Sequence, residues 1–277
     1  MSDISISYET KSGTDSEKTY SSETKSVNLS GCDITHIDLE QFNQFQNLEK
    51  LDLSANWLET IILDPLSEQK ELEYLDLSSN RLTQIDLWPT ESMNLKFLSL
   101  AINKIRNINL APLAFSVKLE ELYLQTNSIQ SIELVALSHC KQLRFLRLDD
   151  NDIYAIDLDA LAGCARLQEL FLESNPLETI DLSPLRGCEQ LEGLWLRDTG
   201  LLAINLHPLS ESKSLLWLDL TDNELHFLDI TPLMNCRDLE SVMVDDSVIL
   251  IADIKYKERD FPYALKKFRD RMYWPES

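Results

Sequence analysis

The chain has 277 residues, of which 44% are hydrophobic, and its formal net charge is −22 at pH 7. Residues 1–23 contribute −3 to that charge and residues 248–277 contribute +2, so residues 24–247 carry −21. A negative field of this size repels nucleic acid phosphates and anionic membranes, and it favours basic partners. The longest apolar run, Val248–Ala252, is too short to span a bilayer, and no secretory signal follows Met1. We therefore expect a cytoplasmic protein that binds neither nucleic acid nor membranes.

Residues 1–23 are rich in Ser, Thr, Glu and Lys. Such a composition is typical of a disordered leader or of a polar hairpin that caps the first repeat. Ile4, Ile6 and Tyr8 alternate with serines, and alternate residues of a strand share one face. The alternation favours the hairpin.

Residues 24–247 form ten units with a period near 24 residues. Two successive copies are Leu48, Leu51, Leu53, Asn56 and Leu72, Leu75, Leu77, Asn80. The Asn column is Asn56, Asn80, Asn103, Asn127, Asn151, Asn175 and Asn223, replaced elsewhere by Cys32, Thr199 and Ser247. Leucines two positions apart lie on one side of a short strand, so stacked units predict a parallel sheet over one continuous leucine core. The Asn column then predicts a buried amide ladder that serves the backbone turn after each strand.

A second apolar pair with a polar residue between follows each turn, as in Ile85-Asp86-Leu87 and Ile180-Asp181-Leu182. The alternation predicts a second short extended segment. Next come sequences such as Ser183-Pro184-Leu185, where a capping residue precedes Pro at the first helical position. We expect a short helix or 3₁₀ turn there.

The spacing L-x-x-L-x-L-x-x-N/C-x-L resembles that of the leucine-rich repeat family, over about four-fifths of the chain. The resemblance implies an α/β solenoid, a horseshoe with a concave parallel β-sheet and a convex side of short extended segments and short helical or 3₁₀ turns. It also implies a recognition scaffold rather than an enzyme. The 24-residue units with I-D-L and P-L motifs look similar to prokaryotic or archaeal cytoplasmic members.

Four of the five cysteines, Cys140, Cys164, Cys188 and Cys236, occupy the same place in their units. Equivalent positions of a solenoid point the same way, so we expect small core residues in a reducing compartment rather than disulfides. His139 beside Cys140 invites a zinc interpretation, but the closely spaced ligand pairs of zinc sites are missing. We predict no metal.

Residues 248–277 are expected to cap the last repeat. Leu265, Phe268 and Met272 follow Pro262 at spacings that share one face of a short helix. The alternative is a basic partner-binding tail, because Lys266, Lys267, Arg269 and Arg271 lie in the same stretch. No glycine-rich phosphate loop, G-x-S-x-G elbow or paired metal-ligand motif is present in the sequence, so we expect no catalysis and no cofactor.

The outward strand positions carry the functional prediction. One aromatic residue stands there in each of seven consecutive units, which predicts a band about 29 Å long if strands repeat every 4.8 Å. Half-exposed rings would make a patch larger than those of ordinary monomer surfaces, whereas rings that stack across the sheet would have a structural role. The expected partner-binding residues are Tyr74, Phe97, Tyr123, Phe145, Arg147, Asp149, Phe171, Glu173, Trp195, Arg197 and Trp217.

Carboxylates beside these rings favour a basic protein or peptide, held by ion pairs and cation–π contacts. Two alternatives remain open. The same face could join two copies in a homodimer or larger assembly, or the chain could be a regulatory subunit of a GTPase, phosphatase or ubiquitin ligase.

Overall fold

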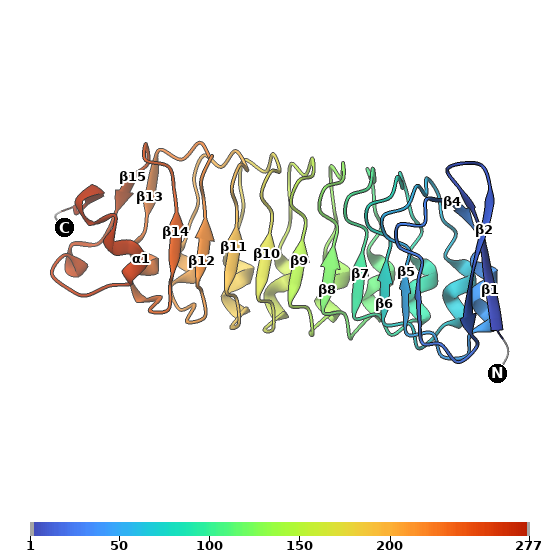
Figure 1. Ribbon diagram of the computed structural model, residues 1–277. Coiled ribbons are helices and arrows are strands. Elements are labelled where there is room, and N and C mark those ends of the chain that lie inside the picture. Colours follow the sequence, from blue (N-terminus) through green and yellow to red (C-terminus); the bar gives the residue numbers. More distant parts are fainter. Residues whose placement is uncertain (1–2, 276–277) are drawn as a thin grey trace. The chain divides into compact units, whose positions relative to one another are not determined.

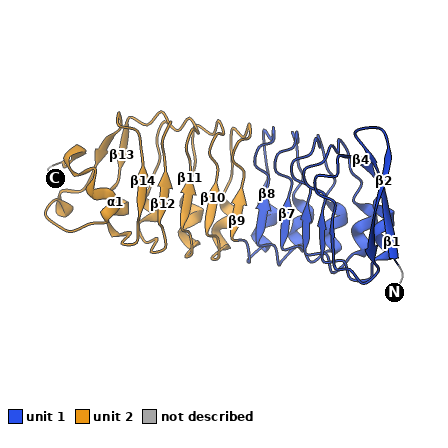
Figure 2. Cartoon of the chain, viewed as in Figure 1, with its two compact units in different colours: residues 1–143 blue, residues 144–277 orange. Residues whose placement is uncertain are grey.

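The structure is a computed structural model that describes residues 3–275. The chain forms two compact units, residues 1–143 and residues 144–277 (Figure 2). Within each unit the chain winds into stacked coils, with a strand on one side of each coil and a short 3₁₀ turn after it (Figure 1).

Residues 1–143 contain a parallel sheet to which each predicted repeat contributes one strand. Its strands are β3 (Ser26–Asn28), β5 (Lys50–Asp52), β6 (Tyr74–Asp76), β7 (Phe97–Ser99) and β8 (Glu121–Tyr123). The register pairs Leu51 with Leu75 and Leu75 with Leu98, so the inward leucines form one buried column. The 3₁₀ turns of this unit are Leu39–Gln44, Asp64–Glu68, Trp88–Ser92, Ala111–Phe115 and Val135–His139.

A second, antiparallel sheet begins this unit. It consists of β1 (Asp3–Thr10), β2 (Asp15–Ser21) and β4 (Ile34–Ile37), with β1 in the middle. Ile4, Ile6 and Tyr8 are buried, as their alternation predicts, so residues 3–21 form a hairpin rather than a disordered leader.

Residues 144–277 contain a second set of parallel repeat strands: β9 (Phe145–Arg147), β10 (Glu169–Phe171), β11 (Gly193–Trp195), β12 (Trp217–Asp219) and β14 (Ser241–Met243). A smaller parallel sheet joins β13 (Phe227–Asp229), β15 (Ile249–Ile251) and β16 (Met272–Tyr273). The helical segments are α1 (Tyr263–Lys266) and the 3₁₀ turns Asp159–Gly163, Ser183–Gly187, His207–Leu209, Thr231–Asn235, Ile254–Tyr256 and Arg269–Arg271. None of the helices within residues 3–275 is long and apolar enough to cross a membrane.

These strands and 3₁₀ turns confirm the predicted solenoid of parallel strands. Most of the described I-D-L segments are not assigned to a β-sheet. The exceptions are β4, which pairs with β1, and β13, which pairs with β15. The expected caps before Pro are wrong. In several turns, including those that begin at Trp88 and Asp159, the first N–H instead bonds to the middle residue of the I-D-L segment, as Ser183 N does to Asp181 Oδ1 at 2.9 Å. This bond lowers the pKa of Asp181.

The Asn column forms the predicted ladder. Asn80 Oδ1 accepts a hydrogen bond from Leu58 N at 3.0 Å, and its amide donates to the carbonyls of Leu53 and Leu77. At position 199 a hydroxyl replaces the amide, and Thr199 Oγ1 lies 2.9 Å from both Leu196 O and Asn223 Oδ1. Asn80 therefore ties its own turn to the preceding coil, whereas Thr199 bonds within its own coil and to Asn223 of the following one.

The residue before each Asn has a left-handed backbone, and Ile102 is the costliest case. Its φ is +55° although it is β-branched, and its side chain is 51% exposed. Left-handed backbone costs ordinary residues about 1–2 kcal/mol, whereas Asn tolerates it. We predict that Ile102→Asn stabilises the protein by about 1 kcal/mol in urea unfolding. Val117→Asn, at an exposed residue without positive φ, is the control. An equal gain in both variants would contradict the backbone explanation.

The cysteine column is buried as predicted. Cys140, Cys164, Cys188 and Cys236 are buried, and the Sγ of Cys188 points to Leu161 O at 3.4 Å. Burial raises the pKa of Cys188 to about 12 and that of Cys236 to about 11, so both stay protonated at neutral pH. They act as small core residues.

The C-terminal segment contains less helix than expected. Leu265, Phe268 and Met272 are all buried, but α1 ends at Lys266 and Met272 lies in β16. The three residues therefore do not share one helix. Lys266 pairs with Asp260 and Arg271 bonds to residues 245–248, which places part of the basic cluster in internal contacts.

Candidate functional site

All seven predicted aromatic residues lie on the outward face of their strands, and all are partly buried. In residues 1–143, Tyr74 and Phe97 stack with ring centroids 4.2 Å apart, and Tyr123 meets Phe97 edge to face at 5.3 Å. The hydroxyls of Tyr74 and Tyr123 donate to Asp76 and Glu121. Burial, and after it the Asp76 carboxylate, raises the pKa of Tyr74. These rings expose less than the half assumed from sequence, because they pack against one another.

Residues 144–277 carry the other four rings, and three neighbouring strands form an ordered stack there. The Arg147 guanidinium lies 4.5 Å from the centre of the Phe171 ring. Trp195 lies parallel to Phe171 on the next strand, with centroids 5.8 Å apart. We call Arg147, Phe171 and Trp195 the stacked row. Phe145 and Trp217 flank it on β9 and β12, and the Arg144 guanidinium lies over the Phe145 ring.

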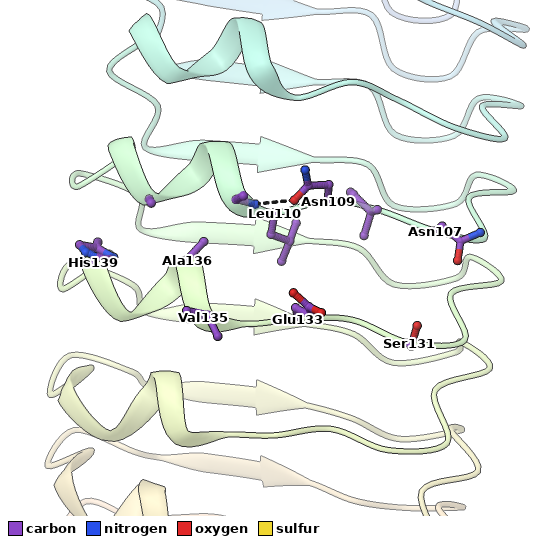
Figure 3. A pocket seen from close by; sticks show the side chains of 11 residues that line it. Asn107, Asn109, Leu110, Ser131, Glu133, Val135, Ala136 and His139 are labelled. Carbon is purple, nitrogen blue, oxygen red and sulfur yellow. Dashed lines mark hydrogen bonds between the residues drawn. The ribbon is translucent and has the colours of Figure 1, made fainter.

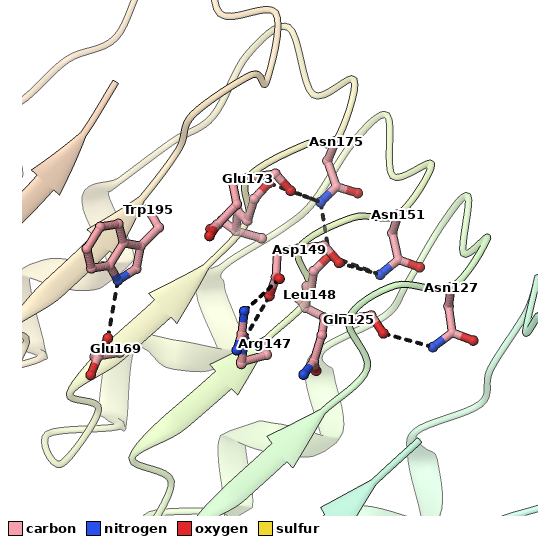
Figure 4. Close-up of polar contacts among 11 residues, drawn as sticks. Gln125, Asn127, Arg147, Leu148, Asp149, Asn151, Glu169, Glu173, Asn175 and Trp195 are labelled. Carbon is pink, nitrogen blue, oxygen red and sulfur yellow. Dashed lines mark hydrogen bonds and ion pairs between the residues drawn. The ribbon is translucent and has the colours of Figure 1, made fainter. Parts of the chain in front are cut away.

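Trp195 is held in place by a carboxylate on the neighbouring strand β10. Its indole N–H donates to Glu169 Oε2 at 3.2 Å (Figure 4). The ring lies over Gly193 of its own strand, where an added Cβ would be 2.8 Å from Nε1. Gly193 therefore leaves the room that the ring occupies. A glycine at an outward strand position, two residues before a Trp, is the sequence signal that could have pointed to the role of Gly193.

Two ion pairs fix the guanidinium groups. Arg147 binds Asp149 with two nitrogens, at 3.0 and 2.8 Å, and Asp149 is only 4% exposed (Figure 4). Arg197 binds Asp222 at 2.7 Å, a partner that the sequence did not indicate. The structure therefore brings Arg147, Asp149, Phe171 and Trp195 together and directs Arg197 toward the turn after β12.

Glu173 occupies the same outward position in its repeat as Asp149 and Arg197 occupy in theirs. Its Oε2 is buried and has no hydrogen-bond partner among the described residues. Burial, with a smaller contribution from Asp149, raises the pKa of Glu173 to about 7, although Arg147 and the backbone act in the opposite direction. A carboxyl group with this pKa is partly protonated at neutral pH.

The other surfaces show fewer features of a binding site. An open groove of about 560 Å³ lies between two coils of residues 1–143 and is lined by Asn109, Glu133, Val135 and His139 among others (Figure 3). Its walls come mainly from 3₁₀ turns and the segments before them. Within residues 3–275, no group of three or more His, Cys, Asp or Glu side chains is arranged to hold a metal ion.

Comparison with known proteins identifies the repeats. A family model described as leucine rich repeat matches residues 22–84 and 93–153. These two segments are leucine-rich repeats. No curated protein sequence matches it.

Solved structures share the fold. A leucine-rich repeat protein of Leptospira interrogans aligns with a TM-score of 0.69 and 22% identity, over 85% of this chain and 56% of that one. Internalin C2 from Listeria monocytogenes aligns with a TM-score of 0.59 and 26% identity, over 76% of this chain and 84% of that one.

A plant neighbour was solved with its partner. It is the leucine-rich repeat ectodomain of the membrane receptor kinase GASSHO1/SCHENGEN3 from Arabidopsis thaliana, in complex with CASPARIAN STRIP INTEGRITY FACTOR 2. Its TM-score is 0.73 at 28% identity, over 83% of this chain and 28% of that one. This chain thus spans little more than half of the Leptospira protein and about a quarter of the plant ectodomain.

Proposed function

We propose that this protein is a non-catalytic interaction module that binds a basic protein or peptide through the outward sheet face of residues 144–277. The residues that we assign to binding there are Phe145, Arg147, Asp149, Phe171, Glu173, Trp195, Arg197 and Trp217. Tyr74, Phe97 and Tyr123 form a second aromatic surface in the other unit. The observation that carries the proposal is the stacked row, because contacts within the unbound protein already fix the orientation of its rings.

The fold supports this role, since leucine-rich repeat domains generally mediate protein–protein interaction and repeat proteins use extended sheet surfaces for it. The plant neighbour, solved with a bound factor, gives an example. Trp, Tyr and Arg are the residues that dominate binding hot spots, and a preformed arrangement lowers the entropy cost of association.

Charge selects the class of partner. In β9, β10, β11, β12 and β14, the outward positions, continued to the second residue after each strand, hold five acids against two arginines: Asp149, Glu169, Glu173, Asp219 and Asp245 against Arg147 and Arg197. Both arginines are already engaged by carboxylates. The face therefore offers surplus negative charge to a Lys or Arg side chain, with aromatic rings beside it.

We propose a reducing, cytoplasmic location, which the buried free thiols Cys188 and Cys236 support because disulfides form in oxidising compartments.

Selection from a random peptide display library tests the proposed face. We expect the wild type to enrich peptides rich in Lys and Arg, and the double variant Phe171→Ser/Trp195→Ser to lose them. The control Phe115→Ser/Val135→Ser removes two exposed apolar side chains from 3₁₀ turns and should enrich the same peptides as the wild type. Equal enrichment by all three proteins would contradict the proposal. Light scattering of the same proteins tests the homodimer alternative, which requires a wild-type dimer that the first double variant dissociates.

A further inference from the structure

Glu173 differs from the other acids on the outward face of residues 144–277 in having a buried oxygen without a hydrogen-bond partner among the described residues. Asp149 is bound by Arg147, Glu169 accepts the Trp195 indole N–H, and Asp219 accepts the backbone and hydroxyl groups of Thr221. Glu173 Oε2 is buried without a hydrogen-bond partner among the described residues. A buried acceptor without a hydrogen bond destabilises the folded protein, and a donor that bonds to it would recover this free energy.

The charged groups around Glu173 leave it without a dedicated cation. On the preceding coil, Asp149 and Asp150 oppose its ionisation and Arg147 favours it. Arg147 is shared with the almost fully buried Asp149, which holds it with two hydrogen bonds. On the following coil, the Arg197 guanidinium is paired with Asp222. On β10, the strand just before Glu173, Glu169 is engaged by Trp195.

We propose that Glu173 receives a Lys or Arg side chain of the partner, and that its carboxyl group releases a proton to solvent when this cation binds. The inference rests on the proposed function, because it assigns the cation-binding position within that face. Phe171, at the end of the preceding strand β10, and Trp195, on β11, supply apolar and aromatic surface for the aliphatic stem and the cationic head of such a side chain.

The direction of the pH effect follows from linkage. Below the pKa of Glu173, about 7, an incoming cation meets a neutral carboxyl group that must first lose its proton. Above that pKa the carboxylate is already formed. Affinity for a cationic ligand therefore rises as pH increases through this range, and below it binding releases up to one proton.

Calorimetric titration with an octalysine peptide tests the inference, at about pH 6 and about pH 8 and in two buffers of different ionisation enthalpy. We expect wild-type binding to tighten several-fold at the higher pH and to release close to one proton per peptide at the lower pH. In Glu173→Gln, which keeps the shape and loses the titration, we expect weaker binding with neither effect. Glu189→Gln removes one exposed acid near the Ser183–Gly187 turn and should behave like the wild type.

No detectable binding of octalysine, binding without proton release, or equal release in wild type and Glu173→Gln would overturn the inference. Peptide display separates this failure from failure of the proposed function. If selected peptides still require Phe171 and Trp195 while their binding is independent of pH and of Glu173, the face binds a partner and Glu173 is not its cation receptor.

Discussion

Replacing Asn175 by Leu is expected to lower the free energy of unfolding by about 3–5 kcal/mol, because several buried backbone groups lose their partners together. Asn175 is 1% exposed. Its Oδ1 accepts from Ile153 N at 3.0 Å, and its amide donates to the carbonyls of Leu148, Leu172 and Glu173 (Figure 4). Leucine has the same heavy-atom branching and none of these hydrogen bonds, so the change removes the polar contacts without deleting side-chain atoms.

Urea unfolding followed by circular dichroism measures this effect. Asn47→Leu makes the same substitution at an exposed position and should shift the midpoint little. A loss below about 1 kcal/mol for Asn175→Leu would mean that water or a rearranged turn satisfies the backbone groups as well as the amide does.

Replacing Arg271 by Met is expected to cost about 2–4 kcal/mol and to loosen the C-terminal cap, since hydrogen bonds from charged donors contribute about 1.5–3 kcal/mol. Its Nη1 donates to Asp246 Oδ1 at 2.9 Å. Its Nη2 donates to the carbonyls of Asp245, Asp246 and Val248 at 2.9 to 3.2 Å. One guanidinium therefore fastens the segment before β16 to the turn after β14.

Amide hydrogen exchange locates this loss. In Arg271→Met we expect faster exchange in β15 and β16, with the strands β9 to β11 unchanged. Lys267→Met removes an exposed cation from the same segment and should leave exchange as in the wild type. Uniformly faster exchange along residues 144–275 would show that the cap is not a separate cooperative element.

The spacing of Leu and Asn was enough to predict the repeat, because each of these residues has a single role. A Leu at the wrong phase would face water, and an Asn at the wrong phase would not reach the turn. The strands, the leucine column and the amide ladder follow from spacing alone, as at Leu75 and Asn80. The hairpin of residues 3–21 followed from alternation in the same way.

The site residues were harder to derive because their roles depend on side-chain direction between neighbouring coils. Spacing placed Arg197 beside Trp195, yet the guanidinium turns to Asp222. Gly193 carries no chemistry of its own and matters only because Trp195 lies over it. The unusual pKa of Glu173 comes from burial, which the sequence pattern does not report. Similarly, the cap at Asp181 looked like part of an extended segment.

The central claim is that partners bind the outward face around the stacked row, and NMR of the five tryptophan indole N–H groups tests it most directly. With a display-selected basic peptide, we expect the Trp195 and Trp217 signals to shift and those of Trp57 and Trp88 to stay in place. Gly193→Ala, which displaces the Trp195 ring, should weaken the same peptide. Shifts confined to Trp88, on its 3₁₀ turn, or binding that leaves Trp195 and Trp217 unchanged, would contradict the account.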